Sequence, residues 1–206
     1  VYQDQKTWIS FKNIIFSNEP AAKIQNKNLK VIRSGKEKGI FVGGCLTLVA
    51  NSIGTVYELD TRNKILFLED VSEKAYAIDR MLTHMKLAGL FKKCRGIVFG
   101  SMSGPDSKRE YENTVKRVFS DCDFPIMMGL NAGHCKNKLS LPLNVKAEMN
   151  TKTKSITFLE SALRDERNYS PSHASARVIG RFFANGQRWQ NGLSASFWCC
   201  GPWSVF

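Results

Sequence analysis

Three short apolar runs, separated by helical patterns, constrain the fold of this chain more than any other feature. The runs occupy residues 65–68, 96–100 and 125–129. Continuous apolar character over so few residues is typical of strands that are buried on both faces. The stretches between the runs place apolar side chains at helical spacing. Strands that alternate with helices predict βα units around a parallel sheet, and therefore an α/β domain.

Two further signals extend this pattern. Ser72 is the expected N-cap of a helix that ends at Gly89, and another helix is expected over residues 109–119. After residue 139 the pattern changes, and apolar residues recur at every second position. Alternating residues at 145–149 and 156–160 flank a polar turn, which predicts a β-hairpin. The domain is therefore expected to combine a parallel layer with a smaller antiparallel one.

A glycine pair lies between an expected strand at residues 39–42 and an expected helix at residues 45–52. Such a junction allows backbone N–H groups at the start of the helix to approach an anion. A tight strand-to-helix turn explains Gly43-Gly44 more simply, and we favour that interpretation.

The composition is that of an ordinary globular protein with a basic surface. The 206 residues are 43% hydrophobic and 23% charged, enough for one large or two small domains. The formal charge is +12, from 30 Lys and Arg against 18 Asp and Glu. Such a surface attracts anions. The lysines are scattered rather than interleaved with aromatic side chains, so we favour a solubilising surface over a nucleic-acid partner.

The chain carries no signal for a membrane or for secretion. It has no apolar run long enough for a transmembrane helix, so no membrane partner is expected. It begins at Val1, without Met, which indicates a fragment or a processed start, and residues 1–6 do not resemble a signal peptide. None of the six cysteines forms a Cys-x-x-Cys pair. We therefore expect a reducing, cytoplasmic compartment and no bound metal.

A carboxylate pair and a histidine are the candidate catalytic groups. Glu69 and Asp70 end the first apolar run, and His134 follows Gly133 in a turn after the third. A carboxylate that holds an imidazole makes up two-thirds of a hydrolytic triad. Side chains alternate along a strand, so Asp70 should point away from Glu69. A serine on a sharp, glycine-flanked turn would complete the triad, and we find none.

Each of these signals has a simpler explanation when taken alone. Most glutamates at strand ends are solvated, and a lone histidine is usually structural. The His134-Cys135 pair could indicate a thiolate nucleophile or a metal site, but adjacent side chains rarely converge on one target. His84 and His173 are interpreted as incidental.

An ordered series of motifs resembles the LD-carboxypeptidase family of serine peptidases. Residues 35–47 read GKEKGIFVGGCLT, similar to the family pattern G-x-x-x-G-x-x-V-G-G-N-L-S. Cys45 stands where that pattern has asparagine. The remaining matches follow in order at residues 54–55, 65–70, 76–82, 88–90, 96–100, 133–134, 139–143 and 156–160. The resemblance covers residues 29–163.

The resemblance implies a Ser-Glu-His triad, in which Glu69 holds His134 and His134 acts as base and then as acid. The family's serine lies in a Gly-x-Ser-Asp turn of a separate N-terminal domain, and this sequence contains no such turn. The chain thus resembles the C-terminal domain alone, a three-layer β/β/α swivelling fold that needs no cofactor. Residues 1–28 are then a remnant of the inter-domain segment, and residues 164–206 an irregular tail of unknown origin.

The resemblance also implies a substrate and partners. The substrate would be a murein tetrapeptide or a related peptide, cleaved at an L,D-peptide bond, and the basic surface suits its carboxylates. The first expected partner is the missing nucleophile domain, and a homodimer is left open. By itself the chain is expected to be inactive. The alternative hypothesis is a catalytically inactive remnant that serves as a binding or interaction module.

Overall fold

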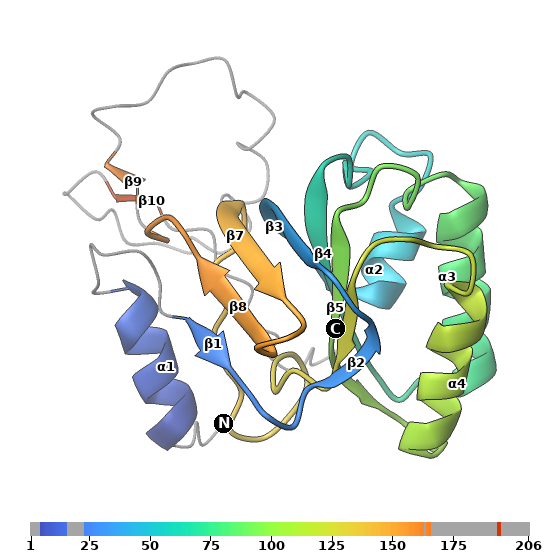
Figure 1. The fold of residues 1–206 in the computed structure, drawn as a ribbon, viewed down its shortest axis with the longest axis horizontal. Coiled ribbons are helices and arrows are strands. Elements are labelled where there is room, and N and C mark those ends of the chain that lie inside the picture. The colour runs from blue at the N-terminus through green and yellow to red at the C-terminus, as the bar shows by residue number, and fades with distance from the viewer. Residues whose placement is uncertain (1–4, 16–22, 163, 166–192, 195–206) are drawn as a thin grey trace, which may run out of the picture.

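One mixed β-sheet organises the chain. The computed structural model describes residues 5–15, 23–162, 164–165 and 193–194. Its 8-stranded sheet has the order β1-β8-β7-β3-β4-β5-β6-β2 (Figure 1). The strands are β1 (Ile24–Gln25), β2 (Lys30–Arg33), β3 (Lys36–Cys45), β4 (Lys64–Val71), β5 (Gly96–Ser103), β6 (Ile126–Met128), β7 (Val145–Asn150) and β8 (Ser155–Phe158). A separate antiparallel pair is formed by β9 (Arg164–Asp165) and β10 (Leu193–Ser194).

The central strands β3, β4, β5 and β6 pair in parallel, as their continuous apolar runs predict. The helices are α1 (Gln5–Ile15), α2 (Leu46–Asn51), α3 (Ala75–Leu87) and α4 (Lys108–Val118). Helices α2, α3 and α4 lie together on one side of these strands (Figure 1). The prediction of an α/β domain is confirmed.

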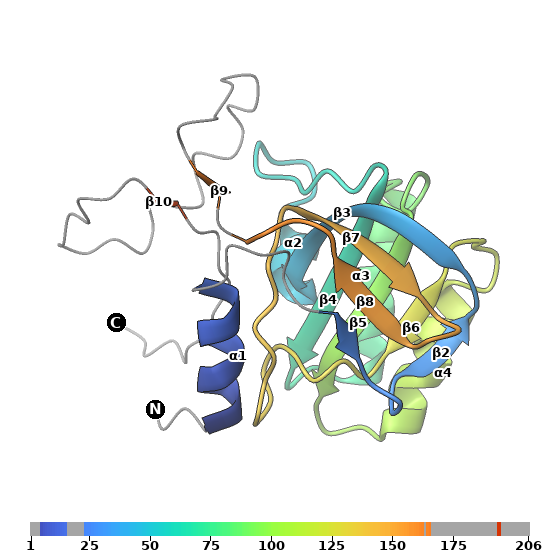
Figure 2. The same cartoon turned by 60° about the vertical axis from the view of Figure 1, so that its left-hand side comes forward.

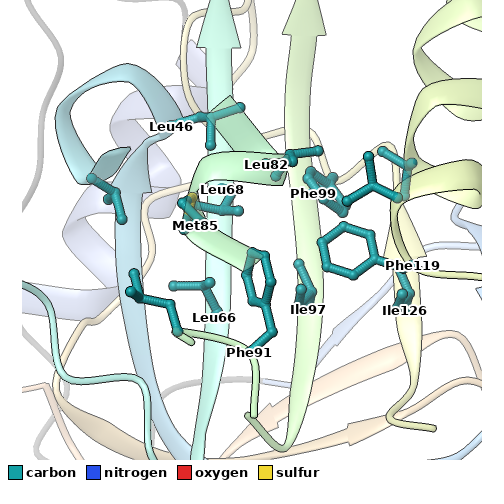
Figure 3. Close-up of a cluster of buried hydrophobic side chains, with 14 of the residues drawn as sticks. Leu46, Leu66, Leu68, Leu82, Met85, Phe91, Ile97, Phe99, Phe119 and Ile126 are labelled. Atoms are coloured by element: carbon teal, nitrogen blue, oxygen red, sulfur yellow. The ribbon is translucent and has the colours of Figure 1, made fainter. Parts of the chain in front are cut away.

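The apolar stripe of α3 meets the sheet in the larger of two hydrophobic clusters (Figure 3). Leu82 and Met85 of α3 are fully buried in it, against Leu66 and Leu68 of β4. Ile97, Phe99, Phe119 and Ile126 extend the same cluster toward α4 and β6. Burial of these side chains from water holds the helical layer on the sheet.

The antiparallel strands continue the same sheet, and the sheet curls so that they cover its other face. The second hydrophobic cluster joins side chains of β4 and β5 to those of β7 and β8, which are not their neighbours in the strand order. A Cβ added to Gly96 of β5 would lie 3.0 Å from Sδ of Met149 in β7. Phe41 of β3 packs edge-on against Phe158 of β8 at a centroid distance of 5.3 Å. This curl produces the predicted β/β/α layering.

Helix α1 lies beside the loop that connects β6 and β7 (Figure 2). Its contact with that loop includes the backbone N–H of Ser140, which donates to Oγ of Ser10 at 2.9 Å. Thr7 and Ile14 of the helix are buried, while Trp8 and Ile9 are about half exposed.

The start of α3 differs from its prediction. The N-cap is Lys74 rather than Ser72, and its side chain makes no capping hydrogen bond. Ser72 instead has a φ of 67°, and its N–H donates to the carbonyl of Ser103 on the adjoining strand. Asp106 supplies the missing acceptor, because its Oδ2 accepts from the N–H of Ala75 at 2.6 Å. A side chain distant in sequence therefore replaces the local cap, which no local pattern could predict.

Among the described residues, no helix is both long and apolar enough to span a membrane. The predictions for the aromatic residues of the tail, for His173 and for Cys199-Cys200 lie outside the described residues.

Candidate active site

The candidate catalytic residues meet at the carboxyl edge of the parallel strands. Glu69 lies near the end of β4, opposite Cys45 in the register of β3. His134 lies in the loop between β6 and β7. In open α/β sheets, ligands bind outside the carboxyl ends of the strands. The topology therefore brings together two residues that are 65 positions apart in the sequence.

Glu69 accepts two hydrogen bonds from His134 on a single oxygen. Its Oε2 lies 2.9 Å from Nδ1 of the imidazole and 3.0 Å from the backbone nitrogen of the same residue. An ionised carboxylate can only accept, so in the neutral ring this contact favours the tautomer with the proton on Nδ1 and the lone pair on Nε2. The side chain of Glu69 is 1% exposed, whereas that of His134 is 32% exposed. The buried carboxylate thus holds an imidazole that is partly exposed to solvent.

The loop that carries His134 is fixed to the sheet by backbone hydrogen bonds. The carbonyl of Ala132 accepts from the N–H of Ser101 at 2.9 Å, which joins the loop to β5. Asn131 closes the loop on itself, because its carbonyl accepts from the N–H of Leu139 at 2.7 Å. These contacts place the imidazole against the end of β4.

Asp70 points away from Glu69, as the alternation of a strand predicts, and has a different role. Its Oδ2 accepts from the backbone N–H of Thr47 at 2.9 Å and from the Thr47 hydroxyl at 2.8 Å. It is buried at the first turn of α2. The start of this helix is therefore occupied by a carboxylate of the chain itself. The prediction of a tight turn at Gly43-Gly44 is wrong, because both glycines lie within β3, where they pair with Phe67 and Leu68 of β4.

Replacing Asp70 with alanine should destabilise the fold, because it leaves the partly buried N–H of Thr47 without its acceptor. We expect the free energy of unfolding to fall by about 1–3 kcal/mol, the usual cost of an unsatisfied buried polar group. Urea denaturation monitored by circular dichroism would measure it. Asp121→Ala is the matched control, since Asp121 is an exposed partner of Lys86 and exposed ion pairs contribute little. Equal losses in the two variants would contradict this role of Asp70.

The other candidate groups do not form a reactive centre. Burial raises the pKa of the Cys45 thiol, and the nearby carboxylates of Asp70 and Glu69 raise it further. The raised pKa disfavours the thiolate of Cys45, and the thiolate is the nucleophilic form of cysteine. Cys45 is therefore a poor candidate for a nucleophile. His84 is exposed on α3, away from the His134 loop in sequence and topology. Within the part of the chain that the structure describes, no three His, Cys, Asp or Glu side chains are arranged to hold a metal ion.

Two parts of the site were missed at the level of sequence. One is the role of Asp70 at α2, which depends on the side-by-side pairing of β3 and β4. The other is Gly133, whose Cα lies against the carboxylate of Glu69. The position of Gly133 directly before the candidate histidine was the only feature of the sequence that could have drawn attention to it. Among the described residues, no serine or threonine hydroxyl forms a hydrogen bond with His134.

Several known proteins are similar to this chain in sequence. The family model described as the LD-carboxypeptidase C-terminal domain matches residues 38–149. A probable murein peptide carboxypeptidase of Bacillus subtilis is 34% identical over 153 residues, which is 72% of this chain and 48% of that protein. The microcin C7 self-immunity protein MccF of Escherichia coli is 29% identical and is matched over 70% of this chain and 43% of its own length.

Solved structures give the same result. The crystal structure of a muramoyltetrapeptide carboxypeptidase from Oxalobacter formigenes superimposes with a TM-score of 0.64 at 28% identity, over 75% of this chain and 54% of the other. MccF in complex with glutamyl sulfamoyl guanosine gives a TM-score of 0.59 at 27% identity, over 66% of this chain and 42% of the other. The chain therefore spans about half the length of the curated relatives it matches.

Proposed function

Because the chain belongs to the LD-carboxypeptidase C-terminal domain family, we propose that it provides the glutamate and the histidine of a Ser-Glu-His peptidase. Glu69 orients the imidazole and stabilises it when it becomes charged. His134 takes the proton of the attacking serine and then gives it to the leaving amine. The serine comes from a nucleophile domain that is not part of this chain. The substrate is a murein tetrapeptide or a related peptide.

The hydrogen bond between Glu69 and Nδ1 of His134 carries this proposal. It selects the tautomer in which Nε2 can accept a proton, which is what a general base requires. The two residues sit on different elements, so chance proximity along the chain does not explain their contact. The described residues also offer no hydroxyl on the imidazole, in keeping with a nucleophile from another domain.

Exposed apolar side chains near the same edge support a partner domain there. Leu48 follows the end of β3, while Val71 ends β4 and Tyr76 lies in the first turn of α3; all three are exposed. A partner domain that packs at this edge would remove these side chains from water.

The chain alone should not react with a fluorophosphonate probe, which labels activated serines. We expect no labelled band in a gel of residues 1–206, because the sequence has no serine on a Gly-x-Ser-Asp turn. A full-length relative from Bacillus subtilis serves as the positive control. Stoichiometric labelling of this chain would show that it holds its own nucleophile and would contradict the two-domain proposal.

Complementation tests the function itself. This chain is mixed with the part of the Bacillus subtilis relative that it does not match, and release of the terminal D-alanine from a murein tetrapeptide is followed by mass spectrometry. Cleavage by the mixture, with neither part active alone, is the expected result. A stable complex without cleavage would instead favour an inactive binding module.

A further inference from the structure

Gly133 lies where any side chain would collide with the carboxylate of Glu69 in its present position. Its φ is +96°, in the region that favours glycine. A Cβ built on it would lie 2.4 Å from Oε2 of Glu69 and 2.6 Å from Cγ of the same side chain. Both distances are far shorter than any real carbon contact. The oxygen that would be displaced is the one that accepts both hydrogen bonds from His134.

The displacement would fall on the carboxylate rather than on the backbone. The three atoms nearest to the added Cβ all belong to the Glu69 side chain. That side chain is 1% exposed, so the surrounding core restricts where it can move. The cheapest response is a rotation that takes Oε2 away from Nδ1 of His134.

We propose that Gly133 is a positioning residue that sets the tautomer of His134, by allowing the loop backbone to close on Glu69 until one carboxylate oxygen holds both the amide and the ring nitrogen. The inference rests on the proposed function for its catalytic meaning, but the geometry it concerns belongs to this chain alone. The backbone N–H of His134 also binds this carboxylate, so the imidazole ring has little freedom to move relative to it. A site built in this way is assembled before any partner domain arrives.

The loop contains its own matched control. Gly129 has a φ of +87°, close to that of Gly133, but a Cβ added there meets nothing within 4 Å. Gly129→Ala therefore measures how an alanine at positive φ affects the protein. Gly133→Ala measures the same effect together with the steric collision with Glu69. Any difference between the two variants is the effect of the carboxylate.

The tautomer is read by two-bond nitrogen–proton correlations of the imidazole rings in the nitrogen-15-labelled chain, with His134→Ala assigning the signals. The wild type and Gly129→Ala should show His134 with its proton on Nδ1. Gly133→Ala should lose most of that population and resemble Glu69→Ala, which lacks the acceptor. A His134 proton that remains on Nδ1 in Gly133→Ala, with the fold intact, would overturn the proposal.

A double variant covers the case in which Gly133→Ala does not fold. Glu69→Ala removes the atoms that the new Cβ would meet, so Gly133→Ala/Glu69→Ala should fold even where Gly133→Ala does not. Adding Gly133→Ala to the Glu69→Ala variant should then lower the free energy of unfolding only slightly. The loss should be no larger than the loss that Gly129→Ala causes in the wild type. A double variant as unstable as Gly133→Ala would show that strain elsewhere is responsible, and would overturn the role of Glu69.

Activity in the complemented enzyme gives a separate result. Gly133→Ala should lower kcat by about 100-fold, the scale expected for misplacement of a catalytic group by about 1 Å, with KM little changed. Gly129→Ala should stay near the wild type. If the complemented wild type shows no cleavage, the proposed function fails, whereas the tautomer measurement still decides the role of Gly133.

Discussion

In the complemented enzyme, Glu69→Gln should reduce kcat by about 10⁴-fold and His134→Ala by about 10⁶-fold, the scale seen for loss of the orienting acid or of the base in a serine triad. The histidine variant loses more because no group remains to take the serine proton. The glutamine variant keeps a polar side chain of similar size but loses the charge that favours the Nδ1–H tautomer and stabilises the imidazolium.

Matched surface variants control for the substitutions themselves. His84→Ala replaces an exposed histidine of α3, and Glu148→Gln replaces a glutamate that pairs with Lys36 and Lys38 outside the site. Both should cleave the tetrapeptide at the wild-type rate. Rates are measured under single-turnover conditions, so that slow product release does not mask the chemical step. Wild-type cleavage by His134→Ala would remove the histidine from the mechanism.

Phe41→Ala should lower the free energy of unfolding by about 3–5 kcal/mol, the usual cost of deleting a buried aromatic side chain. Phe41 is fully buried in the cluster between the parallel strands and the antiparallel ones. Its ring contacts Phe67 of β4 and Phe158 of β8, so the cavity would open where the curled sheet closes on itself. Unfolding in urea, followed by tryptophan fluorescence and circular dichroism, measures the change.

Leu87→Ala is the comparison for this variant, since Leu87 is 82% exposed at the end of α3. Its effect should stay within about 0.5 kcal/mol, as for most surface substitutions. A loss below about 1 kcal/mol for Phe41→Ala would mean that the two faces of the curled sheet do not depend on this contact.

Local patterns predicted most of the elements, and the failures have a common cause. The apolar runs that became β4 and β5 and the helical spacing that became α3 needed only the residues nearby. The start of α3 was predicted wrongly, because its first N–H is satisfied by Asp106, 31 positions away. Where a distant side chain supplies the hydrogen bond, the local sequence carries no record of it.

For the candidate site too, some features could be predicted from the sequence and others could not. The sequence alone singled out Glu69 and His134, and the ordered motifs around them identified the family. It also determined that Asp70 faces away from Glu69, since side chains of a strand alternate. These conclusions depend on short spacings and on the order of residues, which a chain carries whether or not it is folded.

Only the tertiary structure decided that the two candidate residues touch, and that one oxygen of Glu69 lies within hydrogen-bond distance of both the backbone nitrogen and Nδ1 of His134. It also showed that a Cβ at Gly133 would collide with that carboxylate. The contact joins the end of β4 to the loop after β6, and the pairing of β4, β5 and β6 sets the distance between them. A hydrogen bond is lost within a few tenths of an ångström. Spacing in the sequence cannot specify position to that precision, whereas a packed sheet with a loop bonded to it can.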